Sequence, residues 1–153
     1  MKKVWCLAVL LFLLVSSVSG LSAKKTVINY WTHTDDNRTR IENRYIAEFE
    51  KMNPNVEIKR VVNEASKMGD IVLTAFAANN GPDIFNLPIE QEYGYIYNQR
   101  VAAVDYQSLG YKNLAALQAD YAPNTFEPVT MNKKIYGLPL ELTNWSIFIN
   151  KKI

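Results

Sequence analysis

The sequence predicts an α/β fold with a doubly wound, mostly parallel sheet. Strand-like and helix-like segments alternate three times between residues 26 and 99. The order strand, helix, strand is the pattern that places helices on both faces of a parallel sheet. The chain has 153 residues, enough for one domain with a core of its own.

The first strand–helix pair is predicted over residues 26–31 and 39–52. The first segment, "TVINYW", is rich in β-branched and aromatic residues, which favour strands. Thr39 followed by Glu42 forms a capping box, so we expect the helix to begin at Thr39. Its apolar residues recur at helical spacing, namely Ile41, Tyr45, Phe49 and Met52. We expect Phe49 to be buried against the sheet.

Two further strand–helix pairs follow. The alternating residues 56–62 predict a second strand, and residues 64–80 predict a helix whose Phe76 is buried. Gly81 can adopt the left-handed conformation that ends a helix. Residues 83–87 read as a short buried strand, and Pro88 opens another helix. Beyond residue 100 the pattern weakens to a helix at 111–121 and strands at 134–142 and 146–152.

The N-terminus has the layout of a secretory signal peptide. Lys2 and Lys3 precede an apolar run at residues 4–15, and small residues follow in "SSVSG". The alternative, a membrane anchor, requires about 20 apolar residues, more than this run contains. We therefore expect a signal peptide over residues 1–20, cleaved near 20–23. Cys6 lies inside it, so the mature chain is cysteine-free, which favours a bacterial periplasm.

Charge argues against nucleic acid as a partner. The chain has 17 basic and 15 acidic residues, and removal of Lys2 and Lys3 leaves 15 of each. No basic block remains to bind a phosphate backbone or an anionic membrane surface.

Polar residues gather where the predicted strands end. Open α/β sheets bind ligands at the carboxyl ends of their strands. The candidates there are Trp31, His33, Asp35 and Asp36 after the first strand, and Asn86 and Glu90 after the third. The acidic residues have an alternative role, since carboxylates also cap helices and interact with the helix dipole. Metal ligation is not expected, because the mature chain holds one histidine and no cysteine. No cofactor motif or catalytic motif is present.

Four stretches, in this order, resemble a known family. They are "INYWT", "IAEFEKMNPNVEIKRV", "ANNGPDIFNLP" and "KKIYGLPLELTNWSIFINKKI". With the signal peptide, they resemble the N-terminal part of an extracellular solute-binding protein of an ABC importer, in the sugar-binding group. One departure is Ile149, where family members usually have an aromatic residue.

The resemblance implies a periplasmic-binding-protein-like lobe at residues 24–143, with a hinge strand beginning at 144–153. The chain would then stop before a second lobe. It also implies that Glu141, Thr143, Asn144 and Trp145 lie at the lobe junction and contact ligand. Glu90 matches an acidic position of the maltodextrin-binding branch, whereas Leu87 replaces that branch's aromatic residue, which argues against maltodextrin.

The expected function is capture of a carbohydrate in the periplasm and its delivery to an ABC permease in the inner membrane. The chain is expected to act as a monomer and not as an enzyme. Two alternatives remain open. One is a binder of another small polar solute, such as a polyamine or a metal complex. The other is an exported α/β hydrolase that uses His33 with Asp35 or Asp36.

Overall fold

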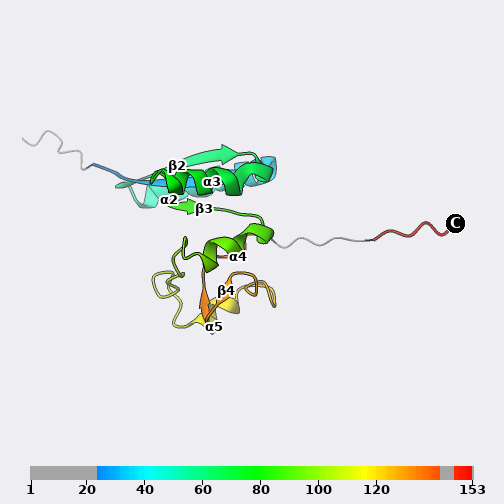
Figure 1. Cartoon of the computed structure of the whole chain (residues 1–153). Helices are drawn as coiled ribbons and strands as arrows, with labels where there is room; N and C mark the ends of the chain where they lie inside the picture. The colour runs from blue at the N-terminus through cyan, green and yellow to red at the C-terminus, as the bar shows by residue number, and fades with distance from the viewer. Residues whose placement is uncertain (1–23, 142–146, 153) are drawn as a thin grey trace, which may run out of the picture.

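The computed structural model describes residues 24–141 and 147–152. Its central sheet has three parallel strands in the order β2-β1-β3. The strands are β1 (Thr26–His33), β2 (Val56–Asn63) and β3 (Ile84–Phe85), and the helices that alternate with them are α2 (Asp36–Met52), α3 (Met68–Ala77) and α4 (Ile89–Tyr97). The arrows of β2 and β3 point the same way (Figure 1). The predicted α/β fold with a parallel sheet is thereby confirmed.

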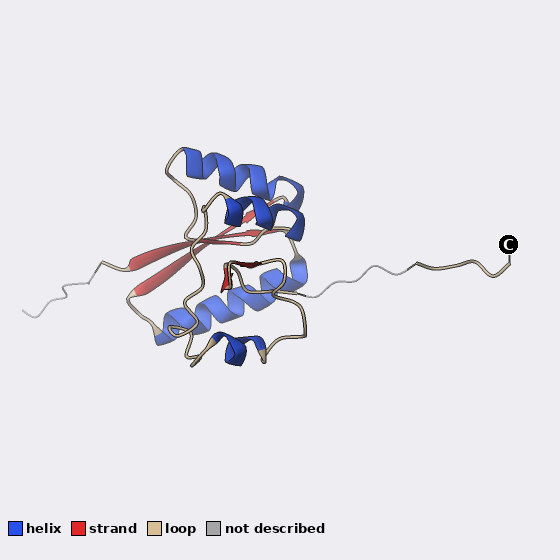
Figure 2. Ribbon diagram, turned by 60° about the horizontal axis from the view of Figure 1, so that its bottom comes forward, coloured by secondary structure: helices blue, strands red, loops and turns tan. Residues whose placement is uncertain are grey.

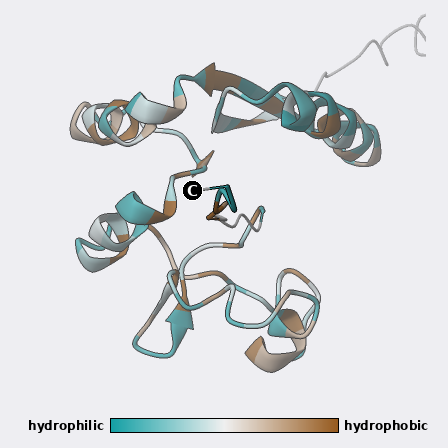
Figure 3. Ribbon diagram, turned by 90° about the vertical axis from the view of Figure 1, so that its right-hand side faces the viewer, coloured by the Kyte–Doolittle hydropathy of each residue, from teal (hydrophilic) through white to brown (hydrophobic). Residues whose placement is uncertain are grey.

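Helices lie on both sides of the sheet (Figure 2). The side chain of Tyr30 faces α2 and donates a hydrogen bond to Glu42 at 2.6 Å. The neighbouring Trp31 points to the opposite face, because successive side chains of a strand alternate. There it packs with Met68 and Val72 of α3 and Tyr95 of α4. The helices carry hydrophilic and hydrophobic residues around their circumference, as Figure 3 shows.

The helix α2 begins at Asp36 and not at Thr39, which corrects the predicted start. Asp35 is the N-cap, and its carboxylate accepts the Arg38 backbone N–H. The Thr39 hydroxyl instead accepts a hydrogen bond from Arg60 on β2. Glu42 likewise binds Arg60, at 2.8 Å. The Thr-x-x-Glu pattern thus fixes the helix on the sheet, because tertiary partners compete for the same side chains.

The residues of the predicted apolar stripe of α2 are exposed, so the expectation that Phe49 is buried is wrong. Phe49 is 39% exposed, and no residue of α2 is buried. The face turned to the sheet carries Glu42 and Glu50 instead, and Glu50 accepts the Ile58 N–H of β2. The apolar stripe lies about 100° further round the helix. Phe76 of α3, which was expected to be buried, is half-buried. Its ring packs edge-on against that of Phe85, with 5.5 Å between the ring centroids.

The turn after α3 uses asparagine, not Gly81, for its left-handed residue. Asn79 has φ 55°, whereas Gly81 has no positive φ. Gly81 is required for a different reason: a Cβ there would collide with the Phe76 ring. The sequence correctly predicted where the helix ends. Glycine is needed at position 81 because the Phe76 ring leaves no room for a Cβ, and not because of a left-handed backbone.

A second core lies below α4 and holds the segment after residue 100. Its buried members are Ile96, Leu117, Phe126, Val129 and Ile135. The helix predicted at 111–121 is only α5 (Leu114–Gln118), and the strand predicted at 83–87 is the two-residue β3. The strand predicted at 134–142 is reduced to β5 (Lys134–Ile135), which pairs antiparallel with β4 (Thr130–Met131).

Residues 147–152 form no strand, which corrects the predicted hinge strand over the part the structure describes. Ile147 and Phe148 are both 93% exposed, so no neighbouring strand covers them. A strand needs such a neighbour to satisfy its backbone hydrogen bonds. The predicted signal peptide and cleavage point lie outside the described residues. In the part of the chain that is described, no helix is long and apolar enough to cross a membrane.

Candidate ligand-binding site

The carboxyl ends of the three strands meet at one edge of the sheet. His33 and Asn63, the last residues of β1 and β2, are paired in register. Asn86 directly follows β3, and its N–H binds the Trp31 carbonyl of β1 at 3.2 Å. The parallel topology therefore brings side chains from three distant segments together, as the sequence predicted for this edge.

Four polar side chains form a connected cluster there. The Asn86 amide lies 2.8 Å from His33 Nδ1. Arg38, from the first turns of α2, places Nη1 3.1 Å from His33 Nε2. Its Nη2 donates to Glu141 Oε1 at 2.5 Å, a contact between residues 103 positions apart. We call Asn86, His33, Arg38 and Glu141 the strand-edge cluster.

The cluster is half enclosed. Asn86 is 8% exposed, and the Arg38 side chain is 12% exposed. The Glu141 side chain is 55% exposed, so the cluster opens to solvent through Glu141. A guanidinium with so little water around it is best stabilised by a carboxylate and good hydrogen bonds.

Asp35 borders the cluster as the cap of α2. The hydrogen bond from the Arg38 backbone N–H holds the pKa of the Asp35 carboxyl below its usual value, and the Arg38 charge adds to this effect. Asp35 therefore stays ionised near neutral pH and keeps the first turn of α2, with Arg38, in place.

Unpaired polar atoms mark the same edge. Asn63 Nδ2 and Asn86 Oδ1 are buried without a hydrogen-bond partner among the described residues. Leaving such a group unpaired costs about 1–3 kcal/mol, so each calls for an explanation. Asn63 ends β2 and Asn86 follows β3, so the buried donor and the buried acceptor lie on either side of the end of β1. A ligand that offers several hydroxyl groups is suited to both.

The predicted site residues divide into three groups. His33, Asn86 and Glu141 belong to the cluster, and Asp35 borders it. Trp31 packs in the core, while Asp36 and Glu90 are exposed in the first turns of α2 and α4. Thr143, Asn144 and Trp145 lie outside the described residues. The role of each in ligand binding stays a prediction.

Two members of this edge were not predicted. Arg38 was missed because it lies just before the predicted helix start at Thr39, where an arginine usually faces solvent. Its position three residues after the capping Asp35 is a signal in hindsight, since that residue's N–H meets the cap. Asn63 was missed because it reads as the turn residue after a strand.

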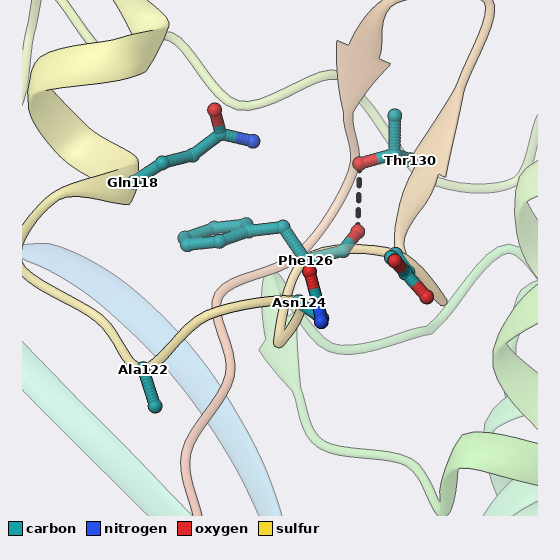
Figure 4. Close-up of a pocket in the computed structure, with 6 residues that line it drawn as sticks. Gln118, Ala122, Asn124, Phe126 and Thr130 are labelled. Carbon is teal, nitrogen blue, oxygen red and sulfur yellow. Dashed lines mark hydrogen bonds between the residues drawn. The ribbon is translucent and has the colours of Figure 1, made fainter.

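A separate hollow of about 500 Å³ lies beside the second core (Figure 4). Its lining residues are Gln118, Ala122, Asn124, Phe126, Glu127 and Thr130. Phe126 is 5% exposed, and the Thr130 hydroxyl already donates to the Phe126 carbonyl. The hollow therefore presents little free aromatic surface, and the strand-edge cluster is the better candidate for a ligand site.

The strand-edge cluster offers groups that can form hydrogen bonds to a polar ligand. It offers a cationic donor, a carboxylate and amide groups. No group of three histidine, cysteine or acidic side chains able to hold a metal is found in the described part of the chain. The carboxyl ends of the strands are the place where open α/β sheets bind ligands, so the fold and this edge define a ligand-binding α/β lobe.

The comparison with protein families identifies the class more narrowly. The model of the bacterial extracellular solute-binding protein family matches residues 35–153. The chain belongs to this family. No curated protein matches it.

Solved structures agree with this fold. The sugar-binding protein MalE from Xanthomonas citri has 22% identity and a TM-score of 0.63. A structure from a study of xylan utilization by Caldanaerobius polysaccharolyticus has 27% identity and a TM-score of 0.58. An ABC substrate-binding protein from Listeria monocytogenes, in complex with cycloalternan, has 21% and 0.57. Each match covers 74% of this chain and 28% of the other.

Proposed function

We propose that the chain is the N-terminal, ligand-contacting part of a periplasmic carrier that captures a carbohydrate and delivers it to an ABC permease. The observation that carries the proposal is the strand-edge cluster, which joins the ends of β1 and β3 and the first turn of α2 to Glu141. Glu141 is the last residue described before the segment that would leave the lobe.

The chemistry of the edge supports a polyhydroxylated ligand. A sugar hydroxyl both donates and accepts, so separate hydroxyls of one sugar can pair with Asn63 Nδ2 and with Asn86 Oδ1. Arg38 and Glu141 add a donor and an acceptor within one ion pair. The sugar-binding relatives support this class of ligand but do not name the sugar.

Binding is favoured over hydrolysis by the state of His33. Both of its ring nitrogens have neighbours, Arg38 on one side and Asn86 on the other. A general base needs a free ring nitrogen within reach of the proton that it removes. Asp35 is engaged as the cap of α2, which supports a structural role for its carboxylate over a catalytic one.

A panel of sugars and chromogenic substrates tests the proposal. Neutral mono- and oligosaccharides should perturb the amide signals of the strand-edge cluster in an NMR titration, and nitrophenyl glycosides and esters should not be hydrolysed above background. Hydrolysis that disappears in His33→Ala would identify an enzyme. Signals that respond only to polyamines would identify the other class of solute binder.

The transport step needs a separate test. In cells that carry the gene with its neighbouring permease genes, deletion of the gene should abolish uptake of the bound sugar. Uptake that is unaffected by the deletion would contradict the carrier role.

A further inference from the structure

Residues 137–141, which we call the strap, lead from the second core to the strand-edge cluster. The chain just before the strap is anchored in the second core, where the Tyr136 N–H binds the Val129 carbonyl at 2.9 Å. Within the described part of the chain, the strap itself makes one hydrogen bond to the rest of the lobe, from Arg38 to Glu141. This ion pair therefore fixes the far end of the strap at the first turn of α2.

The ion pair lies where it can break. The Arg38 side chain is 12% exposed, but that of Glu141 is 55% exposed, so water and salt ions reach the carboxylate. Leu138 and Leu140 are 38% and 62% exposed, and apolar burial adds little to hold the strap. An ion pair of this kind typically shifts an equilibrium by less than about tenfold. The strap can therefore open without unfolding of the lobe.

Arg38 also covers the ring of His33. Its Nη1 lies 3.1 Å from Nε2 and 3.3 Å from Nδ1 of the same ring. A donor in the ring plane could not lie so close to both nitrogens without colliding with the carbon between them. The guanidinium therefore lies over the face of the ring, as arginines often do on aromatic side chains. The Asn86 amide approaches Nδ1 at 2.8 Å, so the imidazole is shielded while Arg38 stays in place.

We propose that Arg38 and Glu141 form a latch. Closed, the ion pair holds the strap at the carboxyl ends of β1 and β3 and keeps Arg38 over His33. When it opens, the strap is released, Arg38 loses the carboxylate that fixes it, and this edge of the sheet becomes accessible. Two segments 103 positions apart thereby move together. The meaning of this access for ligand entry rests on the proposed function, since the strand-edge cluster is the candidate site.

The latch is tested on the ligand-free 153-residue chain by reaction with diethyl pyrocarbonate. This reagent acylates an accessible, neutral imidazole nitrogen, and His33 is the only histidine in the chain, so the imidazole signal reports one site. Rates are compared with that of N-acetylhistidine in the same buffer. Glu141→Gln should raise the rate at His33 by about three- to fivefold, the range that loss of a half-exposed ion pair gives.

Salt opens the latch without a substitution. About 1 M NaCl shortens the Debye length to about 3 Å and weakens the ion pair. It should raise the rate at His33 in the unaltered chain to a similar extent, with little further effect in Glu141→Gln. A salt effect of the same size in both chains would show that salt acts elsewhere and would refute the latch.

The matched control is Glu48→Gln, on the exposed side of α2. The Glu48 side chain is 60% exposed and lies 3.8 Å from Arg44. The substitution removes the same charge from a pair that does not contact the strap, so the rate at His33 should change by less than about twofold. An unchanged rate in Glu141→Gln, or equal increases in Glu141→Gln and Glu48→Gln, would overturn the proposal.

The strap is followed directly by ¹⁵N relaxation. The order parameters of the Leu138 and Leu140 amides should fall in Glu141→Gln, whereas that of Ile135, buried in the second core, should stay near about 0.85, the value of rigid backbone. Unchanged values for the two leucines would contradict the latch. No ligand enters these measurements. Failure of every sugar to bind would therefore refute the proposed function and leave the latch to be decided by His33 reactivity and strap mobility.

Discussion

At the scale of single residues, the strand-edge cluster depends on the cap of α2. Asp35 holds the first turn through the Arg38 N–H, and Arg38 carries the contacts to His33 and Glu141. A change at Asp35 therefore reaches the site through the backbone. A polar residue such as Asp35 can therefore support a binding site without contacting the ligand. The sequence pattern alone does not distinguish this role from direct ligand contact.

We predict that Asp35→Ala lowers the melting temperature by a few degrees at neutral pH, while Asp35→Asn nearly preserves it, because asparagine is also a good cap. The pKa of the Asp35 carboxyl is lowered from 3.8 in the folded chain. Its stabilisation is present above the unfolded value and lost as pH falls through the folded one. Thermal melts between pH 2 and 7 should therefore show a weaker acid dependence in Asp35→Asn; an unchanged dependence would refute the role of the carboxylate.

Two glycines give opposite predictions. Gly81→Ala should destabilise the chain, because the added Cβ would collide with the Phe76 ring. Gly94→Ala, inside α4, should stabilise it by about 0.5–1 kcal/mol, since nothing lies within 4 Å of the added Cβ and alanine favours helices. Urea unfolding of both variants measures the difference. Equal effects would mean that Phe76 moves aside freely.

At the scale of elements, the sequence predicted which segments are strands and which are helices better than it predicted which side of each helix faces the sheet. The alternation from β1 to α4 was predictable because strand and helix periods differ. The orientation of α2 was not, because the hydrogen bonds of Glu42 and Glu50 to the sheet outweigh its apolar stripe. Likewise, the site residues that follow strands were visible, whereas Arg38 gained its place only through contacts with distant residues.

The orientation of α2 is testable with two phenylalanines. Phe126 is 5% exposed in the second core, whereas Phe49 is 39% exposed on α2. Phe126→Ala should cost about 3–5 kcal/mol, and Phe49→Ala less than about half of that. Urea unfolding gives both values. A Phe49→Ala cost equal to that of Phe126→Ala would show that the stripe of α2 is buried in solution.

At the scale of the whole molecule, the chain spans 28% of the length of the three solved structures described above. A solute-binding protein that closes two lobes on its ligand excludes water from the contacts of both. A lobe by itself leaves its hydrogen bonds to compete with water, and each then contributes only about 0.5–1.5 kcal/mol. A few such contacts must also offset the lost freedom of the ligand.

The most direct measurement is therefore an NMR titration of the 153-residue chain with neutral oligosaccharides. We predict saturable shifts in the amide signals of His33, Asn63, Asn86 and Glu141, with a dissociation constant no lower than ~1 mM. The signals around the hollow at Phe126 should stay unchanged. Micromolar affinity would contradict the argument that tight binding needs a second lobe. Shifts confined to the hollow, or no shifts with any sugar, would contradict the strand-edge site itself.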